Sequence, residues 1–297
     1  MHRKDFLRHS VLLAGGISLA NQPLFARRFD DPYKMKMLRN NIGIFTEKGG
    51  TIAYMLGKDG IVVVDSEFPE QANHLIDALK KQSSNSFKLL INTHHHGDHT
   101  SGNIAFKGIV GNVVAHTNSK LNQQTVAVKQ KTEAQQLYPD MTFDDTWQKN
   151  MGAENIKAYY FGAGHTNGDA IIHFQHANVA HLGDLLFNRR HPFVDRTAGA
   201  SMKSWITVLD KTLSTFDDKT IFICGHALDP EKVVVNKDDI KAYQNYLHQV
   251  LDFAAAEIKA GKTKDEFIKN TTIPGNTEWQ GDGIERPLTA AWDELTS

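Results

Sequence analysis

The sequence predicts an α/β fold in which helices cover the outer faces of β-sheets. Short apolar runs typical of strands recur in two blocks along the chain, and each block continues into segments with helical spacing of apolar residues. The 297 residues are 40% hydrophobic and 23% charged, which is ordinary for a globular protein with a sizeable core. Since no linker divides the two blocks, we expect a single domain over residues 27–297.

Residues 1–26 are typical of a secretory signal, with a basic start, an apolar run over 11–20 and small residues near the end. The run is too short to span a bilayer, so we expect no stable membrane insertion. "RKDFL" resembles the twin-arginine export motif with Lys4 in place of the second arginine, which leaves Sec and Tat export both open. The alternative is an amphipathic helix of the mature fold. The signal predicts a periplasmic or secreted protein.

The first block opens with three expected strands, in "NNIGIFT", "TIAYMLG" and "GIVVVDSEF", separated by turns at "KGG" and "KDG". A helix is expected over 69–82, where apolar residues share one face and Pro69 suits the first turn. The strand "FKLLINT" follows, then a strand at "VVAH" and a polar helix over 117–136. Residues 137–155 carry mixed signals, and we expect them to form a loop over the functional site.

The second block predicts strands at "NIKAYYF", "DAIIHFQ" and "NVAHLGDLLF". A helix follows in "SMKSWITVLDKTLSTF", and then a strand in "TIFIC". The block ends with a long amphipathic helix over 238–260. Together the two blocks predict sheets with helices on their outer faces.

The stretch "NTHHHGDHTSGN" leaves the carboxyl end of the strand "FKLLINT" and concentrates histidines next to an aspartate. Side chains alternate in an extended segment, so His94 and His96 are expected on one side and His95 on the other. The glycine that follows permits a sharp turn, which lets Asp98 and His99 approach from a second direction. Histidine nitrogens and aspartate oxygens are metal ligands. The stretch therefore predicts a metal site to which His95 does not contribute.

Three further candidates lie beside glycines at the ends of predicted strands. They are His165 in "GAGHTNGD", Asp184 in "HLGDLLF" and His226 in "FICGHALDP". Strand ends hold side chains in fixed positions, which a metal site needs. The remaining histidines lack such a context, and the single cysteine, Cys224, is expected to be a buried apolar residue.

The order of these candidates resembles the ligand pattern of the metallo-β-lactamase-fold superfamily over roughly residues 40–260. The resemblance implies an αββα sandwich of two mixed β-sheets flanked by helices, with a dinuclear metal site along one edge of the sheets. The ligands that it implies are His94, His96 and His165 for one metal, Asp98, His99 and His226 for the other, and Asp184 as the bridge between them.

Details of the motif narrow the branch of the family. Zinc β-lactamases of the cysteine-containing class carry cysteine where this chain has Asp184, and "THHHGDH" is more similar to the glyoxalase II-like and general hydrolase branch. Members with a redox-active di-iron pair carry glutamate at the position of His96. The resemblance thus implies two Zn²⁺ ions, with iron and manganese as alternative metals.

We therefore expect an exported, dinuclear zinc-dependent hydrolase that cleaves an acyl bond in a small molecule: an ester, thioester, lactone or amide. A metal-bound hydroxide is the expected nucleophile, and Asp98 is expected to orient it. The alternatives are a β-lactamase and a sulfur dioxygenase that holds a single iron. With 33 basic and 34 acidic residues, the chain shows no charge excess that would indicate binding to nucleic acid. The oligomeric state stays open.

Two arginines close to Asp184 have no assigned role in this pattern. In "NRRHPFVDR", Arg189 and Arg190 could bind a carboxylate of the substrate, because a guanidinium group presents paired donors to that group. A salt bridge to Asp195 or a solvated turn is the alternative interpretation.

Overall fold

The computed structural model describes residues 31–297, and Tyr33–Ser297 form one compact unit. The predicted signal at residues 1–26 lies outside the described residues. Within 31–297, no helix combines the length and the apolar character needed to cross a membrane.

The first sheet has seven strands in the order β1-β2-β3-β4-β5-β6-β7. Its first four strands are antiparallel, and parallel pairing follows from β4 to β7, so the sheet is mixed. The strands are β1 (Lys34–Arg39), β2 (Ile42–Thr46), β3 (Ile52–Gly57), β4 (Gly60–Val64), β5 (Phe87–Ile91), β6 (Val110–His116) and β7 (Met141–Phe143).

The second sheet has six strands in the order β15-β13-β11-β10-β9-β8, and it is also mixed because β11 and β13 are parallel. A separate two-stranded sheet pairs β12 with β14. The strands are β8 (Thr146–Met151), β9 (Glu154–Tyr159), β10 (Ile171–Phe174), β11 (Val179–His181), β12 (Phe187–Asn188), β13 (Ile221–Ile223), β14 (His226–Ala227) and β15 (Val234–Val235).

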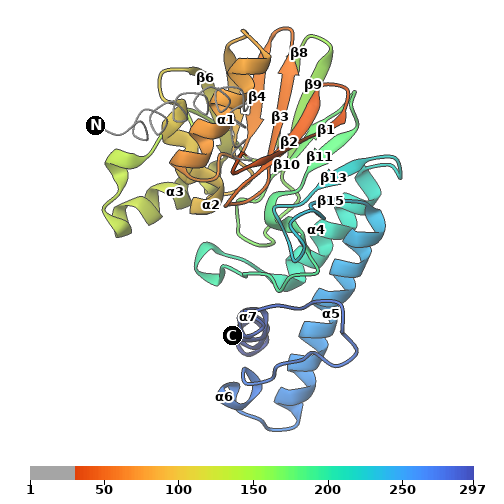
Figure 1. The fold of residues 1–297 in the computed structure, drawn as a ribbon. Helices are drawn as coiled ribbons and strands as arrows, with labels where there is room; N and C mark the ends of the chain where they lie inside the picture. Colours follow the sequence, from red (N-terminus) through yellow and green to blue (C-terminus); the bar gives the residue numbers. More distant parts are fainter. Residues whose placement is uncertain (1–30) are drawn as a thin grey trace, which may run out of the picture. The chain divides into compact units, whose positions relative to one another are not determined.

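The two sheets lie face to face with helices outside them, as Figure 1 shows. The helices are α1 (Pro69–Gln82), α2 (Gly97–Thr100), α3 (Thr117–Gln130), α4 (Met202–Thr215), α5 (Lys237–Lys259), α6 (Lys264–Phe267) and α7 (Glu285–Thr296). Leu75 and Leu79 of α1 pack on the outer face of the first sheet, against residues such as Tyr54. A second core fills the space between the sheets and continues to α4 and α5. The predicted αββα sandwich of mixed sheets is confirmed.

The expectation of a loop over the site at residues 137–155 is wrong. This segment forms β7 and β8, which are edge strands of the first and second sheets. Asp140 directs the chain onto the first sheet, since its Oδ1 accepts a hydrogen bond from the Val113 backbone N–H at 2.8 Å. The preceding helix is shorter than the predicted 117–136 because α3 ends at Gln130, where Lys131 adopts a left-handed conformation with φ 58°.

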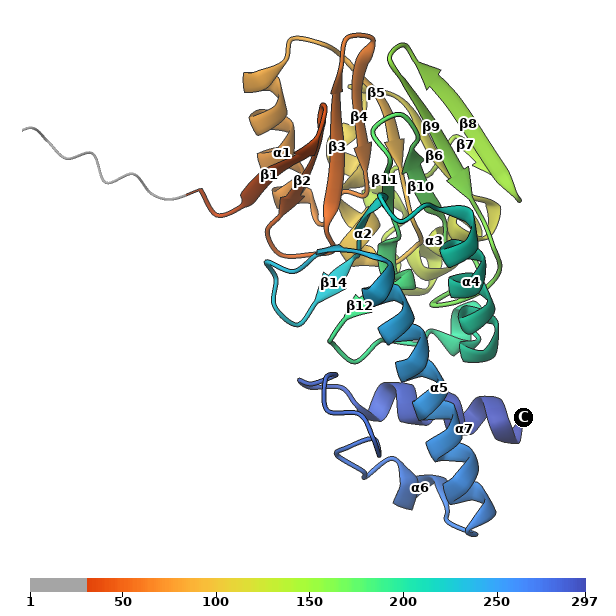
Figure 2. The ribbon, with the colours of Figure 1, turned by 90° about the vertical axis from the view of Figure 1, so that its right-hand side faces the viewer.

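The chain beyond residue 260 adds α6 and α7, which lie beside the distal part of α5 in Figure 2. Glu294 of α7 caps the start of α4: its carboxylate accepts hydrogen bonds from the Ser201 hydroxyl and from the Met202 backbone N–H, both at 2.7 Å. Charge-assisted bonds of this kind fix the C-terminal helix to the body of the sandwich.

Candidate metal centre

The seven predicted ligands converge at one edge of the sandwich. The loop after β5 and the short helix α2 carry His94, His96, Asp98 and His99. His165 lies in the turn between β9 and β10, and the other two candidates are Asp184 in the 3-10 helix Gly183–Leu185 and His226 on β14. These residues form two groups whose ligand atoms could each hold a metal ion: His94, His96, His165 and Asp184 in the first, and Asp98, His99 and His226 in the second.

In the first group the ring nitrogens of three histidines face one another. Nδ1 of His96 lies 3.1 Å from Nε2 of His94 and 2.8 Å from Nε2 of His165. Asp184 Oδ2 is 3.4 Å from His165 Nε2. Three imidazole nitrogens and one carboxylate oxygen therefore surround a common point.

The opposite nitrogen of each of these rings has its own acceptor. His165 Nδ1 donates to the backbone oxygen of Phe193 at 2.7 Å, and His96 Nε2 donates to Asp195 Oδ2 at 2.9 Å. His94 Nδ1 lies 3.1 Å from the Thr93 hydroxyl, which itself donates to Asp65. Each ring hydrogen is thus used outside the group, and each inward nitrogen presents a lone pair.

In the second group, His99 is oriented in the same way. His99 Nδ1 donates to Asp65 Oδ2 at 2.8 Å, so its Nε2 faces inward, 3.1 Å from Asp184 Oδ1 and 3.4 Å from His226 Nε2. His226 Nε2 is 3.0 Å from Asp98 Oδ2. The two oxygens of Asp184 therefore face different groups, which is the arrangement that a bridging carboxylate requires.

The backbone at Gly50 lies directly against the ring of His99. A side-chain atom added at Gly50 would lie 2.1 Å from the His99 ring, so only glycine fits at that position. The Glu67 carboxylate fixes this loop by accepting hydrogen bonds from the backbone N–H groups of Lys48 and Gly49, at 2.8 Å and 2.7 Å. The chain thus encloses the buried side of the second group.

The charges of the two groups favour a bound cation. Burial lowers the pKa of His165 to about 3, so this ring is neutral. Burial opposes the charged form of His99 as well, but Asp184, Asp98 and Asp65 outweigh it and raise the pKa of His99 well above 6.5. Burial also disfavours the ionised form of Asp184, yet His226 and His99 hold the pKa of Asp184 well below 3.8. His165 and Asp184 are thus in the protonation states in which they bind metals, and His99 would release its ring proton when a metal ion takes the place of that proton.

The donor set fits metal ions for a further reason. Inward lone pairs separated by about 3 Å repel one another unless a cation or a proton lies between them. In addition, Asp184 Oδ1 is a buried oxygen without a hydrogen-bond partner among the described residues. Such an atom is costly to bury unless an ion satisfies it.

Comparison with known proteins identifies the family. The family model described as the Metallo-beta-lactamase superfamily matches residues 47–226, more than half of the chain. The chain belongs to the metallo-β-lactamase superfamily.

Individual members of the superfamily are distant from this chain. It is 22% identical to "Metallo-beta-lactamase type 2" of Elizabethkingia meningoseptica over 65% of this chain and 78% of that protein. A solved metallo-β-lactamase from Pontibacter korlensis superposes with a TM-score of 0.61 and 18% identity, covering 73% of this chain and 99% of the other. A double mutant of the sec-alkyl sulfatase PisA1 gives a TM-score of 0.69 at 13% identity over 89% of this chain, which spans half of that protein. These structural likenesses show the fold.

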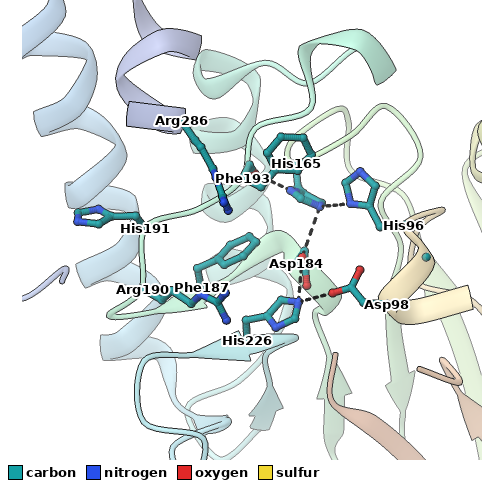
Figure 3. Close-up of a pocket in the computed structure, with 11 residues that line it drawn as sticks. His96, Asp98, His165, Asp184, Phe187, Arg190, His191, Phe193, His226 and Arg286 are labelled. Atoms are coloured by element: carbon teal, nitrogen blue, oxygen red, sulfur yellow. Dashed lines mark hydrogen bonds and ion pairs between the residues drawn. The ribbon is translucent and has the colours of Figure 1, made fainter. Parts of the chain in front are cut away.

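The candidate metal centre opens into a pocket of about 330 Å³. Figure 3 shows His96, His165, Asp184, Asp98 and His226 along one side of it. The opposite side is made by β12, the segment that follows it and the C-terminal helix, with Phe187, Arg190, His191, Phe193 and Arg286. A volume of this size suits a small molecule.

The two arginines singled out in the sequence have different surroundings. Arg189 forms ion pairs with Glu278 and Asp239, at 2.8 Å and 3.5 Å, and its guanidinium lies over the Trp279 ring. Arg190 lines the pocket instead. Neither arginine pairs with Asp195, which contacts His96 and, at 3.6 Å, Nε2 of His95. The ring of His95 therefore belongs to neither of the two groups, although His95, His96 and Asp195 form a third group that could hold an ion.

Sequence reasoning missed the residues that orient the predicted ligands. Asp65 and Asp195 each fix a histidine ring, but neither stands in a motif, because their partners lie 34 and 99 positions away in the chain. The one signal for Asp65 was its place directly after the apolar run "GIVVV", at a strand end beside the site. Arg286 carried no signal, since nothing in the sequence indicated that the C-terminal segment returns to the pocket.

Proposed function

We propose that this chain is a dinuclear zinc-dependent hydrolase that cleaves an acyl bond in a small molecule. His94, His96 and His165 would hold one ion, Asp98, His99 and His226 the other, and Asp184 would bridge them. The observation that carries the proposal is the convergence of ring nitrogens from His94, His96, His99 and His165, each with its opposite ring nitrogen held by a partner outside the groups. Zinc ions in such a site would act as Lewis acids that activate water and polarise the substrate carbonyl.

The protein's own residues would position the reactants. A substrate in the pocket would lie between the ligand groups and Phe187, and it would contact the ring of Phe193, whose centroid is 5.4 Å from that of His96. Burial disfavours ionisation of Asp98, but His99 and His226 outweigh it and lower the pKa of Asp98, so this carboxylate is ionised at neutral pH. Asp98 would accept a hydrogen bond from the attacking water and orient it toward the carbonyl carbon.

The candidate acyl substrates are esters, thioesters, lactones and amides. The names of the relatives favour a β-lactamase as the second candidate, since two of them are called metallo-β-lactamases. Turnover of a chromogenic cephalosporin would separate this candidate from the first. Export to the periplasm or the medium, proposed from residues 1–26, would bring the protein into contact with such compounds.

The test is metal quantification on the purified protein joined to assays with ester, thioester, lactone and lactam substrates. We expect about two zinc ions per chain, and the variant His96→Ala should lose bound metal together with hydrolysis. His248→Ala, an exposed histidine of α5, is the matched control and should change neither. Unaltered metal content and activity in His96→Ala would refute the ligand assignment, and one iron per chain without hydrolysis would favour a sulfur dioxygenase.

A further inference from the structure

We infer that Arg190 and Arg286 form a subsite that binds a carboxylate of the substrate, so that the preferred substrates are acyl compounds with a second, anionic group. The inference rests on the proposed hydrolytic site and names its substrate class. Both arginines line the same pocket as Asp98 and His226. In Figure 3 they extend toward Phe187 from two different elements, the segment after β12 and the helix α7.

The positive charge of this part of the pocket is not neutralised by the protein. Among residues 31–297, no acidic side chain lies within ion-pair distance of Arg190, and the ion pair of Arg286 is with its chain neighbour Glu285, at 3.7 Å with both side chains more than half exposed. Exposed ion pairs of this kind are weak, so Glu285 does not prevent Arg286 from binding an anion. The carboxylates of the pocket itself, Asp98 and Asp184, face the histidines.

Backbone contacts with the C-terminal segment fix the position of Arg190. Arg189 adopts a left-handed conformation with φ 60°, and its side chain pairs with Glu278 of the C-terminal segment. The Gln280 backbone N–H donates to the Arg189 oxygen at 3.0 Å, and Arg190 forms a β-bridge with Gln280. The indole N–H of Trp279 donates to the Phe187 oxygen at 3.2 Å. The backbone around Arg190 is therefore fixed against the C-terminal segment, while its side chain lines the pocket and stays available to a ligand.

The other residues that line the pocket indicate the shape and polarity of the rest of the substrate. Phe187 and Phe193 supply apolar surface between the arginines and the histidines. A guanidinium group binds a carboxylate through two parallel hydrogen bonds, and two guanidinium groups can hold one carboxylate from two sides. The substrate would accordingly have its scissile acyl bond at the ligand groups, an apolar body against the phenylalanines and a carboxylate at Arg190 and Arg286.

A pair of matched esters tests this specificity. One is the mono-4-nitrophenyl ester of pentanedioic acid, which keeps a free carboxylate, and the other is the uncharged 4-nitrophenyl pentanoate. In Arg190→Gln and Arg286→Gln we expect the ratio of kcat/KM for the charged ester over the neutral ester to fall about 10-fold, the scale of one charge-assisted hydrogen bond. The lysine variants should lie in between, because they keep the charge but lose the paired donors. Lys58→Gln removes an exposed charge of the β3–β4 turn and should leave the ratio unchanged. An unchanged ratio in both arginine variants would overturn the subsite.

Direct binding separates this inference from the proposed function. Calorimetry with pentanedioate on the zinc-loaded protein should show binding that weakens about 10-fold in Arg286→Gln. If the protein binds pentanedioate in this way but hydrolyses none of the esters, the hydrolase proposal fails and the subsite stands. If it hydrolyses the esters and pentanedioate binding is independent of both arginines, the subsite fails alone. Tighter binding of inorganic sulfate than of pentanedioate would overturn the assignment to a carboxylate.

Discussion

The orientation of each histidine ring decides whether its inward nitrogen can bind a metal ion, and Asp65 fixes the orientation of the His94 and His99 rings. Its Oδ2 accepts hydrogen bonds from His99 Nδ1 and from the Thr93 hydroxyl, at 2.8 Å and 2.7 Å, and the Thr93 oxygen contacts His94. The carboxylate therefore acts on one histidine of each group. Asp65 is fully buried and has φ 65°, a conformation that aspartate and asparagine tolerate better than most residues.

The variant Asp65→Asn tests this role because it keeps the size of the side chain and its tolerance of positive φ. An amide has one acceptor oxygen and an NH₂ group, so at least one of its donors would face a donor of Thr93 or His99. We expect zinc affinity to fall about 10- to 100-fold, the usual effect of losing the partner of a metal-ligating histidine. Competition with a chromophoric chelator measures it.

Asp252→Asn, on the exposed face of α5, is the matched control and should retain full affinity. Equal affinities for Asp65→Asn and the unmodified protein would mean that the rings are oriented by packing alone.

At this scale the sequence predicted the ligands better than their partners. His94, His96, Asp98 and His99 share one short loop, so their proximity follows from backbone geometry that a reader of the sequence can reconstruct. Asp195 reaches His96 across 99 positions, a contact that exists only after the two sheets have packed. Contacts within a short loop can be predicted from the sequence, whereas contacts between distant residues depend on how the sheets pack.

At the scale of elements, the loop between β2 and β3 joins the site to α1. Glu47 accepts a hydrogen bond from His74 of α1 at 2.9 Å, while its own backbone N–H donates to Glu67 at 3.0 Å. The same loop continues to Gly50, which lies against the His99 ring. A change in the pairing of His74 and Glu47 therefore acts on the segment that encloses the second group.

This pair predicts a pH dependence of stability. The hydrogen bond to Glu47 raises the pKa of His74 above its ordinary 6.5, although partial burial opposes the shift. A group with a raised folded-state pKa contributes stability that is fully present below 6.5 and is lost as the pH rises through the higher folded value. In Glu47→Gln we expect a loss of stability that is larger at pH 5.5 than at pH 8.5. Urea unfolding of both proteins at the two pH values measures this, and an equal loss at both would contradict it.

The order and type of most elements could also be predicted from the sequence. The exceptions are informative: residues 137–155 have weak periodicity because β7 and β8 are edge strands whose side chains are largely exposed. Edge strands show little of the apolar alternation that identifies strands in a sequence, so mixed polarity there suggested a loop. The C-terminal helix α7 lies beyond the family resemblance, and no pattern indicated what it packs against.

At the scale of the whole molecule, the C-terminal segment completes the wall of the pocket without supplying any of the predicted ligands. Trp279 is central to this arrangement, because it stacks on Tyr246 with ring centroids 4.8 Å apart and lies beneath the Arg189 guanidinium. Tyr246 in turn contacts Nδ1 of His191 through its hydroxyl at 2.8 Å. The aromatic stack thus supports the segment from Phe187 to His191, which faces the metal centre.

The variant Trp279→Ala should therefore lose stability but keep its metal content. Trp279 is only 5% exposed, and truncation of a buried tryptophan costs about 3–5 kcal/mol of unfolding free energy. Trp279→Phe keeps an aromatic ring and loses the bond to Phe187, for which we expect a smaller cost of about 1 kcal/mol. Both variants should bind zinc with the unmodified stoichiometry, since every predicted ligand lies in loops and strand ends of the sandwich. Thermal unfolding and metal quantification on the same samples give both readouts. If Trp279→Ala lost its metal as completely as His96→Ala while still folded, the C-terminal segment would have to be counted as part of the metal centre and not only as a wall of its pocket.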